Sequence, residues 1–222
     1  HLAPLAELLE LAEEFDAWLV VDEAHATGVF GERGRGALEA AGLTDTQNSL
    51  EGDNAAGRSR IIKIGTLSKA LGAQGGFVVG PATLIELLVN KARSYLFSTA
   101  LSPLLAAAGR RAVELVQSEP EPRRRLLESS AARRAQLAAD GWNVGESESQ
   151  IIPLIVGDNA QALALAARLR ERGVIVPAIR PPTVPPGTAR LRISLTARHD
   201  DDAWDRLIAA LRAARETTGS KA

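Results

Sequence analysis

The first stretch of the chain has the hydrophobic periodicity of an amphipathic helix. Apolar residues recur every three or four positions over residues 2–15, and glutamates lie mostly on the opposite side. An apolar run at 18–21 follows and predicts a short strand, which breaks into Asp22, Glu23 and His25. A helix, then a strand with polar residues at its carboxyl end, is typical of α/β proteins, whose ligands bind beside the strand ends.

The stretch 61–80 predicts two further strands with a glycine-rich loop between them. A β-branched run, 61–64, and an apolar run, 77–80, are bounded by glycines and are typical of short buried strands. Lys69 lies just past the first run, where glycines let other groups approach its backbone closely. This position suits a partly desolvated, nucleophilic amine such as a Schiff-base lysine. Taken alone, Lys69 is equally well explained as a surface lysine in a turn.

The rest of the pattern alternates helices and strands, with a polar excursion at residues 44–60 and a hinge candidate at 119–122. Ser102 followed by Pro103 is typical of a helix start, and Asn159 is the expected cap of a later helix. The predicted helices are 82–92, 103–117, 123–140, 159–172 and 201–215, and the predicted strands are 151–156, 174–179 and 190–195.

Composition excludes several classes of protein. The 222 residues are 45% hydrophobic and 24% charged, as in a globular domain with a real core, and the net charge of −1 provides no basic field for nucleic acid. The arginine-rich helix 123–140 also contains acids, which favours a solvated face over a nucleic-acid patch. The absence of cysteine excludes disulfides and thiolate metal sites. No apolar run approaches the roughly 18 residues of a membrane helix.

The chain contains no methionine and begins at His1 in what reads as a helix. A natural translation product carries an initiator methionine. We therefore expect this chain to be the C-terminal part of a longer protein.

Three residues at predicted strand ends have a coherent joint use. Asp22 and His25 follow one strand and Lys69 follows another, and the strand ends of a parallel or mixed sheet converge on one crevice. A carboxylate can keep a pyridine nitrogen protonated, a histidine can donate to the phenolic oxygen of the same ring, and a lysine can form an imine. Thr66 and Ser68 flank the lysine and could bind a phosphate.

Cations gather at strand ends in the second half of the chain. Strand alternation within 189–195 places Arg190, Arg192 and Ser194 on one face, and Arg180 precedes a proline-rich stretch. A guanidinium facing a crevice is a usual partner for a substrate carboxylate, because its donors form a fork. An exposed strand face without any ligand explains these arginines equally well.

Three motifs resemble the α-oxoamine synthases, pyridoxal-phosphate (PLP) enzymes of the aspartate-aminotransferase fold, fold type I. They are VVDEAHATGVFGERGRG, GTLSKALGAQGG and AIRPPTVPPGTARLRISLTARH. The resemblance covers nearly the whole chain except residues 44–60, which read as an insertion. It implies an α/β fold, with the C-terminal part of the large mixed-sheet domain at 1–105 and a small α+β domain at 106–222.

The resemblance also implies residue roles. Lys69 corresponds to the Schiff-base lysine and α-proton base, Asp22 to the partner of the pyridine nitrogen, and His25 to the partner of the ring oxygen. Further matches are the cofactor-phosphate residue Thr66, the pair Ser98 and Thr99 that reaches the phosphate of a neighbouring subunit, the substrate-binding Arg180 and Thr183, and the substrate-carboxylate residue Arg192. A homodimer is implied, and no metal.

The third motif most resembles the family members that condense L-alanine with pimeloyl-CoA or a pimeloyl-carrier protein in biotin synthesis. Other members, such as glycine C-acetyltransferase and 5-aminolevulinate synthase, remain alternatives. The family's N-terminal part, with a histidine that stacks on the cofactor, is absent before His1, so we expect this chain alone to be inactive. The implied location is cytoplasmic, without a membrane or nucleic-acid partner.

Two alternatives come from other classes of protein. The chain could be a non-catalytic homologue that serves only as a dimerisation partner, although Asp22, His25 and Lys69 are all present. It could also be a nucleotide-binding module whose GTLSKALG stretch binds phosphate. The spacing of a P-loop is absent, which argues against this second alternative.

Overall fold

The computed structural model describes residues 2–43 and 60–219, and the expected excursion at 44–60 lies almost entirely outside them. The contacts divide the chain into two compact units. The first is Ala3–Arg123, and the second is Arg124–Ala222 together with the two N-terminal residues. Within the described residues, no helix is long and apolar enough to cross a membrane.

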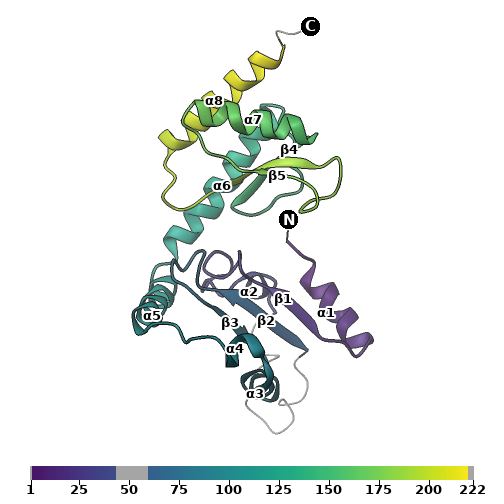
Figure 1. The fold of residues 1–222 in the computed structure, drawn as a ribbon, viewed down its shortest axis with the longest axis vertical. Coiled ribbons are helices and arrows are strands. Elements are labelled where there is room, and N and C mark those ends of the chain that lie inside the picture. Colours follow the sequence, from purple (N-terminus) through teal and green to yellow (C-terminus); the bar gives the residue numbers. More distant parts are fainter. Residues whose placement is uncertain (1, 44–59, 220–222) are drawn as a thin grey trace. The chain divides into compact units, whose positions relative to one another are not determined.

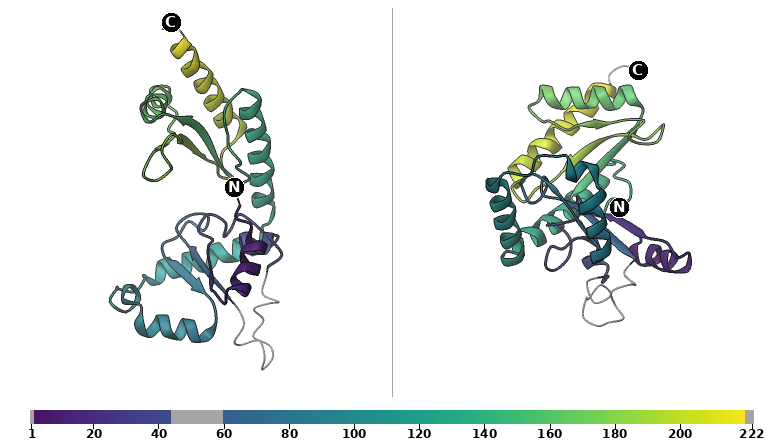
Figure 2. Two further views of the ribbon diagram at one scale, coloured as in Figure 1. Left: turned by 90° about the vertical axis from the view of Figure 1, so that its right-hand side faces the viewer. Right: turned by 60° about the horizontal axis from the view of Figure 1, so that its bottom comes forward.

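The first unit is built on a three-stranded mixed sheet with the order β1-β2-β3. Strands β1 and β2 pair in parallel and β3 runs antiparallel to β2, so the three lie side by side in Figure 1 and Figure 2. The elements in chain order are α1 (Leu5–Glu14), β1 (Leu19–Asp22), α2 (Ala37–Ala40), β2 (Ile61–Thr66), β3 (Gly76–Val79), α3 (Ala82–Lys91), α4 (Arg93–Leu96) and α5 (Pro103–Ser118).

One face of this sheet forms the core of the first unit. Leu5 and Leu9 of α1 pack with Val21 of β1, Leu38 of α2 and Ile61 of β2. The periodicity of residues 2–15 correctly predicts this buried side of α1. Phe15, the last apolar residue of this pattern, is an exception, because it follows the helix and is 70% exposed.

The opposite face of the sheet is exposed, so the prediction of two buried strands is wrong. Val20, Ile64 and Val78 share this face, and their exposed fractions are 55%, 39% and 39%. No helix of the described first unit buries them, because α1 and α2 pack on the other side. The β-branched residues are typical of strands on either face, so composition alone did not distinguish the two.

Helix α5 belongs to the first unit. The Ser102 side chain accepts a hydrogen bond from the Leu105 amide at 3.4 Å, which confirms the predicted cap. Gly109 lies so close to Leu67 that an added Cβ would be 3.3 Å from its Cδ1. These contacts place the boundary at Arg123, later in the chain than residue 105, where the sequence analysis ended the large domain.

A buried carboxylate fixes the chain after β1. Glu23 is 0% exposed, and its two carboxylate oxygens accept hydrogen bonds from the amides of Ala37, at 2.7 Å, and Leu38, at 2.9 Å. These amides open α2, where a helix has unsatisfied N–H groups and favours negative charge. Gly36 has a φ of +119°, and a Cβ there would lie 2.2 Å from the Glu23 Oε2 atom, so glycine is required.

The second unit contains an antiparallel sheet with the order β4-β6-β5. Its elements are the remainder of α6 (Glu121–Ala139), β4 (Ile151–Gly157), α7 (Asn159–Glu171), β5 (Ala178–Ile179), β6 (Ala189–Ser194) and α8 (Asp201–Gly219). Helix α7 contacts all three strands and α8. The core consists of side chains from one face of the sheet and from these helices, among them Ile152, Leu154, Leu165, Leu169, Leu191, Ile193, Leu207 and Leu211.

Two expectations for the second unit need correction. Asp158, not Asn159, caps α7, because its side chain accepts the Gln161 amide at 2.8 Å. The run 174–179 forms only the two-residue strand β5, since most of that run makes no ladder hydrogen bonds. Both errors concern boundaries, which depend on pairing partners as well as on local sequence.

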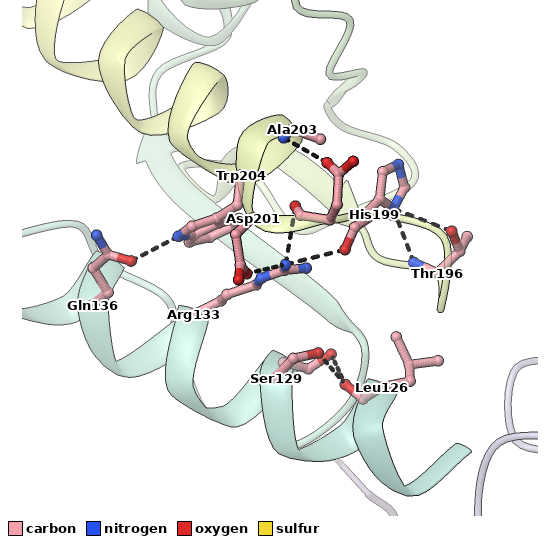
Figure 3. A network of polar contacts seen from close by, with 11 residues as sticks. Leu126, Ser129, Arg133, Gln136, Thr196, His199, Asp201, Ala203 and Trp204 are labelled. Atoms are coloured by element: carbon pink, nitrogen blue, oxygen red, sulfur yellow. Dashed lines mark hydrogen bonds and ion pairs between the residues drawn. The ribbon is translucent and has the colours of Figure 1, made fainter. Parts of the chain in front are cut away.

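The arginine-rich helix α6 is not simply solvated. Arg123 is 7% exposed and donates to the carbonyls of Val116 and Glu32 within the first unit. Arg133 is equally buried and lies 5.3 Å from the Trp204 ring. Figure 3 shows Arg133 beside the start of α8, where it donates to the His199 carbonyl at 3.0 Å. These arginines donate hydrogen bonds to backbone carbonyls. The sequence analysis considered only a solvated face or a nucleic-acid patch for this helix, and neither includes this role.

We expect Glu23→Ala to destabilise the intact gene product by about 3 kcal/mol, because the two amides that open α2 would lose a charged, buried acceptor. Urea unfolding measures this difference. The matched control is Glu10→Ala on the exposed side of α1, which should stay within about 0.5 kcal/mol. Equal stabilities for the two variants would show that the Glu23 carboxylate is not a structural anchor.

Candidate active site

The first group of predicted site residues lies at the carboxyl ends of β1 and β2. Asp22 ends β1 in register with Ile64 of β2, and the Glu23 amide donates to the Ile64 carbonyl at 2.7 Å. Strand β2 ends at Thr66, and Lys69 follows three residues later. Because the strands are parallel, Asp22 and the turn that carries Lys69 leave the sheet at the same edge, as the sequence predicts.

Asp22 offers one carboxylate oxygen to a ligand. Its Oδ1 accepts the Ala24 amide at 2.8 Å, which holds the side chain in a local turn. Its Oδ2 has no hydrogen-bond partner in the described part of the chain, and the residue is exposed. His25 follows in the same turn and is also exposed. A carboxylate oriented by one oxygen and open at the other is suited to accept a hydrogen bond from a cationic N–H.

Thr66 and Ser68 form a small hydroxyl cluster beside Lys69. The Thr66 Oγ1 atom lies 2.8 Å from the Ser68 Oγ, accepts the Ser68 amide at 3.1 Å and donates to the Gly75 carbonyl at 3.0 Å. The Leu67 amide also donates to the Gly75 carbonyl, at 2.9 Å, which closes the base of the loop. Two hydroxyls held together at a turn can bind a phosphate.

Lys69 is exposed, contrary to the expectation of a partly desolvated amine. Its ammonium makes no hydrogen bond or ion pair among the residues in 2–43 and 60–219. The physical reason is its surroundings: Ser68 and Ala70 are themselves exposed, and a Cβ added at Gly72 would meet no other side chain or backbone atom within 4 Å. The same glycines and small residues that allow close approach leave the amine uncovered in this chain. Lys63 differs, because its ammonium donates to the Arg35 carbonyl.

Ser98 and Thr99 lie on an exposed segment between α4 and α5. The segment passes the Lys69 loop, since a Cβ on Gly75 would lie 2.7 Å from the Leu101 Cδ1 atom. No hydrogen bond among the described residues joins either hydroxyl to Thr66 or Lys69. The segment that carries Ser98 and Thr99 therefore passes the predicted site, but neither hydroxyl is bonded to the residues of that site.

Arg180, Thr183 and Arg192 lie in the second unit, and the structure brings only the first two together. The Thr183 amide donates to the Arg180 carbonyl at 3.0 Å, so these two residues bracket a turn after β5. Arg192 lies on the solvent side of β6, between the buried Leu191 and Ile193. The strand alternation predicted for 189–195 is confirmed by this burial pattern.

A cavity of about 270 Å³ in the first unit lies elsewhere. Ile61, Lys63, Phe77 and Val79 line it, and these residues point to the face of the sheet opposite Asp22 and Thr66. The candidate catalytic group is instead an open edge. The cavity and the candidate catalytic group lie on opposite faces of the sheet because successive side chains along β2 point to opposite faces.

Sequence reasoning missed the buried structural roles of Glu23, next to the site residue Asp22, and of Arg123. The sequence shows Glu23 only as one of the polar residues after the first strand, yet its carboxylate is buried and holds the chain that follows Asp22. Its available signal was a carboxylate directly after a strand, followed by Gly36 before a helix. Arg123 offered no such signal, because its partners are backbone carbonyls, and that of Glu32 is 91 residues away in the chain.

The family comparison identifies the class of protein. The family model for aminotransferase class I and II matches residues 1–211, and the chain therefore belongs to this family. A serine palmitoyltransferase from S. paucimobilis with bound PLP and myriocin superimposes with a TM-score of 0.86 at 32% identity, covering 99% of this chain and 52% of that one. The predicted PLP-dependent transferase fold of type I is confirmed.

Curated relatives make the likeness more specific. The chain is 48% identical to an 8-amino-7-oxononanoate synthase from Cupriavidus necator, over 96% of this chain and 51% of the relative. It is 49% identical to an 8-amino-7-oxononanoate synthase from Aromatoleum aromaticum, over 95% of this chain and 51% of that relative. The solved 8-amino-7-oxononanoate synthase from Francisella tularensis superimposes with a TM-score of 0.77 at 26% identity, covering 97% of this chain and 59% of that one.

These comparisons confirm the predicted resemblance to 8-amino-7-oxononanoate synthases. The chain spans about half the length of the curated relatives it matches.

Proposed function

We propose that the protein containing this chain is a PLP-dependent acyltransferase that condenses L-alanine with pimeloyl-CoA or a pimeloyl-carrier protein. The products are 8-amino-7-oxononanoate, carbon dioxide and the free thiol. The observation that carries the proposal is the open edge at β1 and β2, which presents a carboxylate, a free amine and two hydroxyls together. The relatives named above are synthases of this product.

The donor set of this edge fits PLP. The cofactor's pyridine nitrogen needs an anionic acceptor, its aldehyde needs an unpaired amine, and its phosphate needs hydroxyl or amide donors. Within the described residues, Asp22 has a carboxylate oxygen without a partner and Lys69 has an unpaired ammonium. The hydroxyl oxygens of Thr66 and Ser68 lie 2.8 Å from each other. When bound, PLP supplies an electron sink for the carbanion formed at the α-carbon of an amino acid.

Asp22 and His25 would orient the ring. The free Asp22 oxygen would accept a hydrogen bond from the ring N–H, and its charge keeps that nitrogen protonated. The Ala24 amide holds the other oxygen, so the carboxylate does not need to reorganise when charge develops. His25 would donate to the phenolic oxygen from the turn that follows.

Lys69 would serve twice, first by holding the cofactor covalently and then, once freed, by removing the α-proton of alanine. The second role requires a neutral amine close to that proton. The loop between Thr66 and Gly75 is closed by backbone hydrogen bonds, which fix the base of the turn carrying Lys69.

The remaining assignments extend the proposal to substrates and subunits. Arg192 would bind the alanine carboxylate through two parallel N–H donors, and Arg180 and Thr183 would contact substrate from the adjacent turn. Ser98 and Thr99 would reach the cofactor phosphate of a second copy, so we propose a homodimer. The reaction would take place in the cytoplasm, without a membrane or nucleic-acid partner.

Another α-oxoamine synthase is the second candidate, and a specific observation favours it. Serine palmitoyltransferases superimpose with TM-scores of 0.84 to 0.86, at 32–33% identity. The sequence identity of 48–49% with oxononanoate synthases favours the first candidate. The deciding assay compares three pairs on the intact gene product: alanine with pimeloyl-CoA, serine with palmitoyl-CoA and glycine with succinyl-CoA. We expect the first pair to turn over fastest, and a preference for either other pair would reassign the substrate while retaining the class.

Borohydride reduction of the PLP-loaded intact protein should fix the cofactor on Lys69. Peptide mapping locates the adduct, and Lys69→Arg should abolish it, because a guanidinium is not a usable amine nucleophile at neutral pH. Lys91→Arg, an exposed lysine at the end of α3, is the matched control and should leave the adduct unchanged. An adduct on Lys63 or Lys91 would overturn the assignment.

Asp22→Asn should retain PLP but slow the exchange of the alanine α-proton more than a hundredfold, a loss of about 3 kcal/mol in electrostatic stabilisation. Proton exchange in heavy water, followed by NMR, measures this step directly. The control is Asp205→Asn on the exposed side of α8. Near-normal exchange in Asp22→Asn would make Asp22 a strand-end residue without a catalytic role.

Arg192→Lys replaces a forked donor with a point charge, and we expect a cost of about 1–3 kcal/mol in binding of alanine. The KM for alanine should rise about five- to a hundredfold, while the KM for the thioester stays constant. Arg198→Lys, an exposed arginine nearby in sequence, is the control. A change confined to the thioester would remove Arg192 from the amino-acid site.

A further inference from the structure

Arg190 is a second cation on the face of β6 that carries Arg192. The two side chains are two residues apart on one strand, so their Cα atoms are separated by roughly 7 Å. The residues directly across from Arg190 are Ile155 of β4 and Ile179 of β5, and the one across from Arg192 is Pro153. None of these neighbours carries a charge. Within the described residues neither guanidinium has an ion-pair partner.

The guanidinium of Arg190 is held in one direction. Arg190 is half-buried, and its Nε donates to the Thr188 carbonyl at 2.8 Å. Thr188 is itself anchored, because its Oγ1 donates to the Pro185 carbonyl at 2.7 Å and its amide donates to the same atom at 3.2 Å. The two terminal nitrogens of Arg190 have no partner among the described residues. A fork with its stem fixed and its end open is preorganised for a carboxylate.

The loop before Thr188 forms a shallow apolar depression. It is lined by Pro181–Pro186, which contains four prolines and Val184. Proline has no amide donor and a fixed φ, so this surface is stiff and offers few hydrogen bonds. The Thr188 hydrogen bonds tie the depression to Arg190. The apolar depression and the fixed stem of Arg190 are therefore linked through Thr188, four residues apart along the chain.

We propose that this loop and Arg190 bind the acyl group of the thioester, with the polymethylene chain against Pro181–Pro186 and the terminal carboxylate on Arg190. The inference rests on the proposed function, which assigns Arg192 to the amino-acid carboxylate and leaves Arg190 without a role. A straight acyl chain with a carboxylate at its far end matches an apolar trough with an unpaired guanidinium. Arg190 thereby selects acyl thioesters that carry a terminal carboxylate.

A purely structural role for Arg190 predicts a different behaviour. If Arg190 only braced the loop through Thr188, its loss would disturb every acyl chain alike. The carboxylate hypothesis predicts a loss restricted to chains with a terminal charge. Two ligands with the same seven-carbon chain separate these cases, namely pimeloyl-CoA and heptanoyl-CoA, which lacks the terminal carboxylate.

The test is equilibrium binding of both thioesters to the intact PLP-loaded protein by isothermal calorimetry, without alanine. The wild type should bind pimeloyl-CoA more tightly than heptanoyl-CoA. Arg190→Gln should weaken pimeloyl-CoA binding about ten- to a hundredfold, and should change heptanoyl-CoA binding less than about twofold. Arg170→Gln on the exposed side of α7 is the control and should change neither.

Equal weakening of both thioesters, or no weakening, would overturn the inference. If Arg190→Gln does not fold, Arg190→Lys decides: it keeps the charge but loses the fork, and the preference for pimeloyl-CoA should fall about fivefold. An unchanged preference in that variant contradicts the subsite. Because binding requires no turnover, the two proposals fail separately. If Arg190→Gln weakens only pimeloyl-CoA binding but the wild type forms no product, only the proposed reaction is contradicted. If the wild type forms product but Arg190→Gln weakens binding of both thioesters equally, only the proposed subsite is contradicted.

Discussion

The parallel pairing of β1 with β2 is the constraint on which the candidate active site depends. It brings Asp22 and the Lys69 turn to one edge of the sheet, although more than forty residues separate them in the chain. Glu23 extends this pairing with its amide and holds the start of α2 with its buried carboxylate. Asp22, the last residue of β1, therefore lies on the face that we assign to the ligand, while Glu23 fixes the backbone from the opposite face. Such a division follows from strand alternation, because adjacent residues point to opposite faces.

The second unit uses the same principle on β6, its central strand. Leu191 and Ile193 are buried on the side of α7 and α8, and this burial determines that Arg190 and Arg192 face away from the core. A slip of one residue in register would bury both guanidiniums and expose both apolar side chains, at a large cost in free energy. The hydrophobic core thus positions the cations that we assign to substrate.

Buried arginines and exposed apolar residues show that charge does not predict location in this chain. Arg123 and Arg133 are buried because backbone carbonyls accept their donors, as at the α6–α8 contact in Figure 3. Val20, Ile64 and Val78 are exposed because α1 and α2 pack on the other face of their sheet. The side that carries Asp22 and Thr66 is therefore apolar around a polar edge, an arrangement that favours an aromatic ring bearing charged groups.

The sequence by itself determined the kind of each main element, the family and the strand-end positions of Asp22 and Lys69. Hydrophobic periodicity and glycine-bounded motifs are local, so they can be read without knowledge of contacts. Tertiary structure alone decided the burial of Glu23 and Arg123, the exposed face of the first sheet, the cap at Asp158 and the tether from Arg190 to Thr188. Burial depends on which face of a sheet the helices cover, and a hydrogen bond depends on a partner's position. Both are settled by packing between segments distant in the chain, which local patterns do not encode.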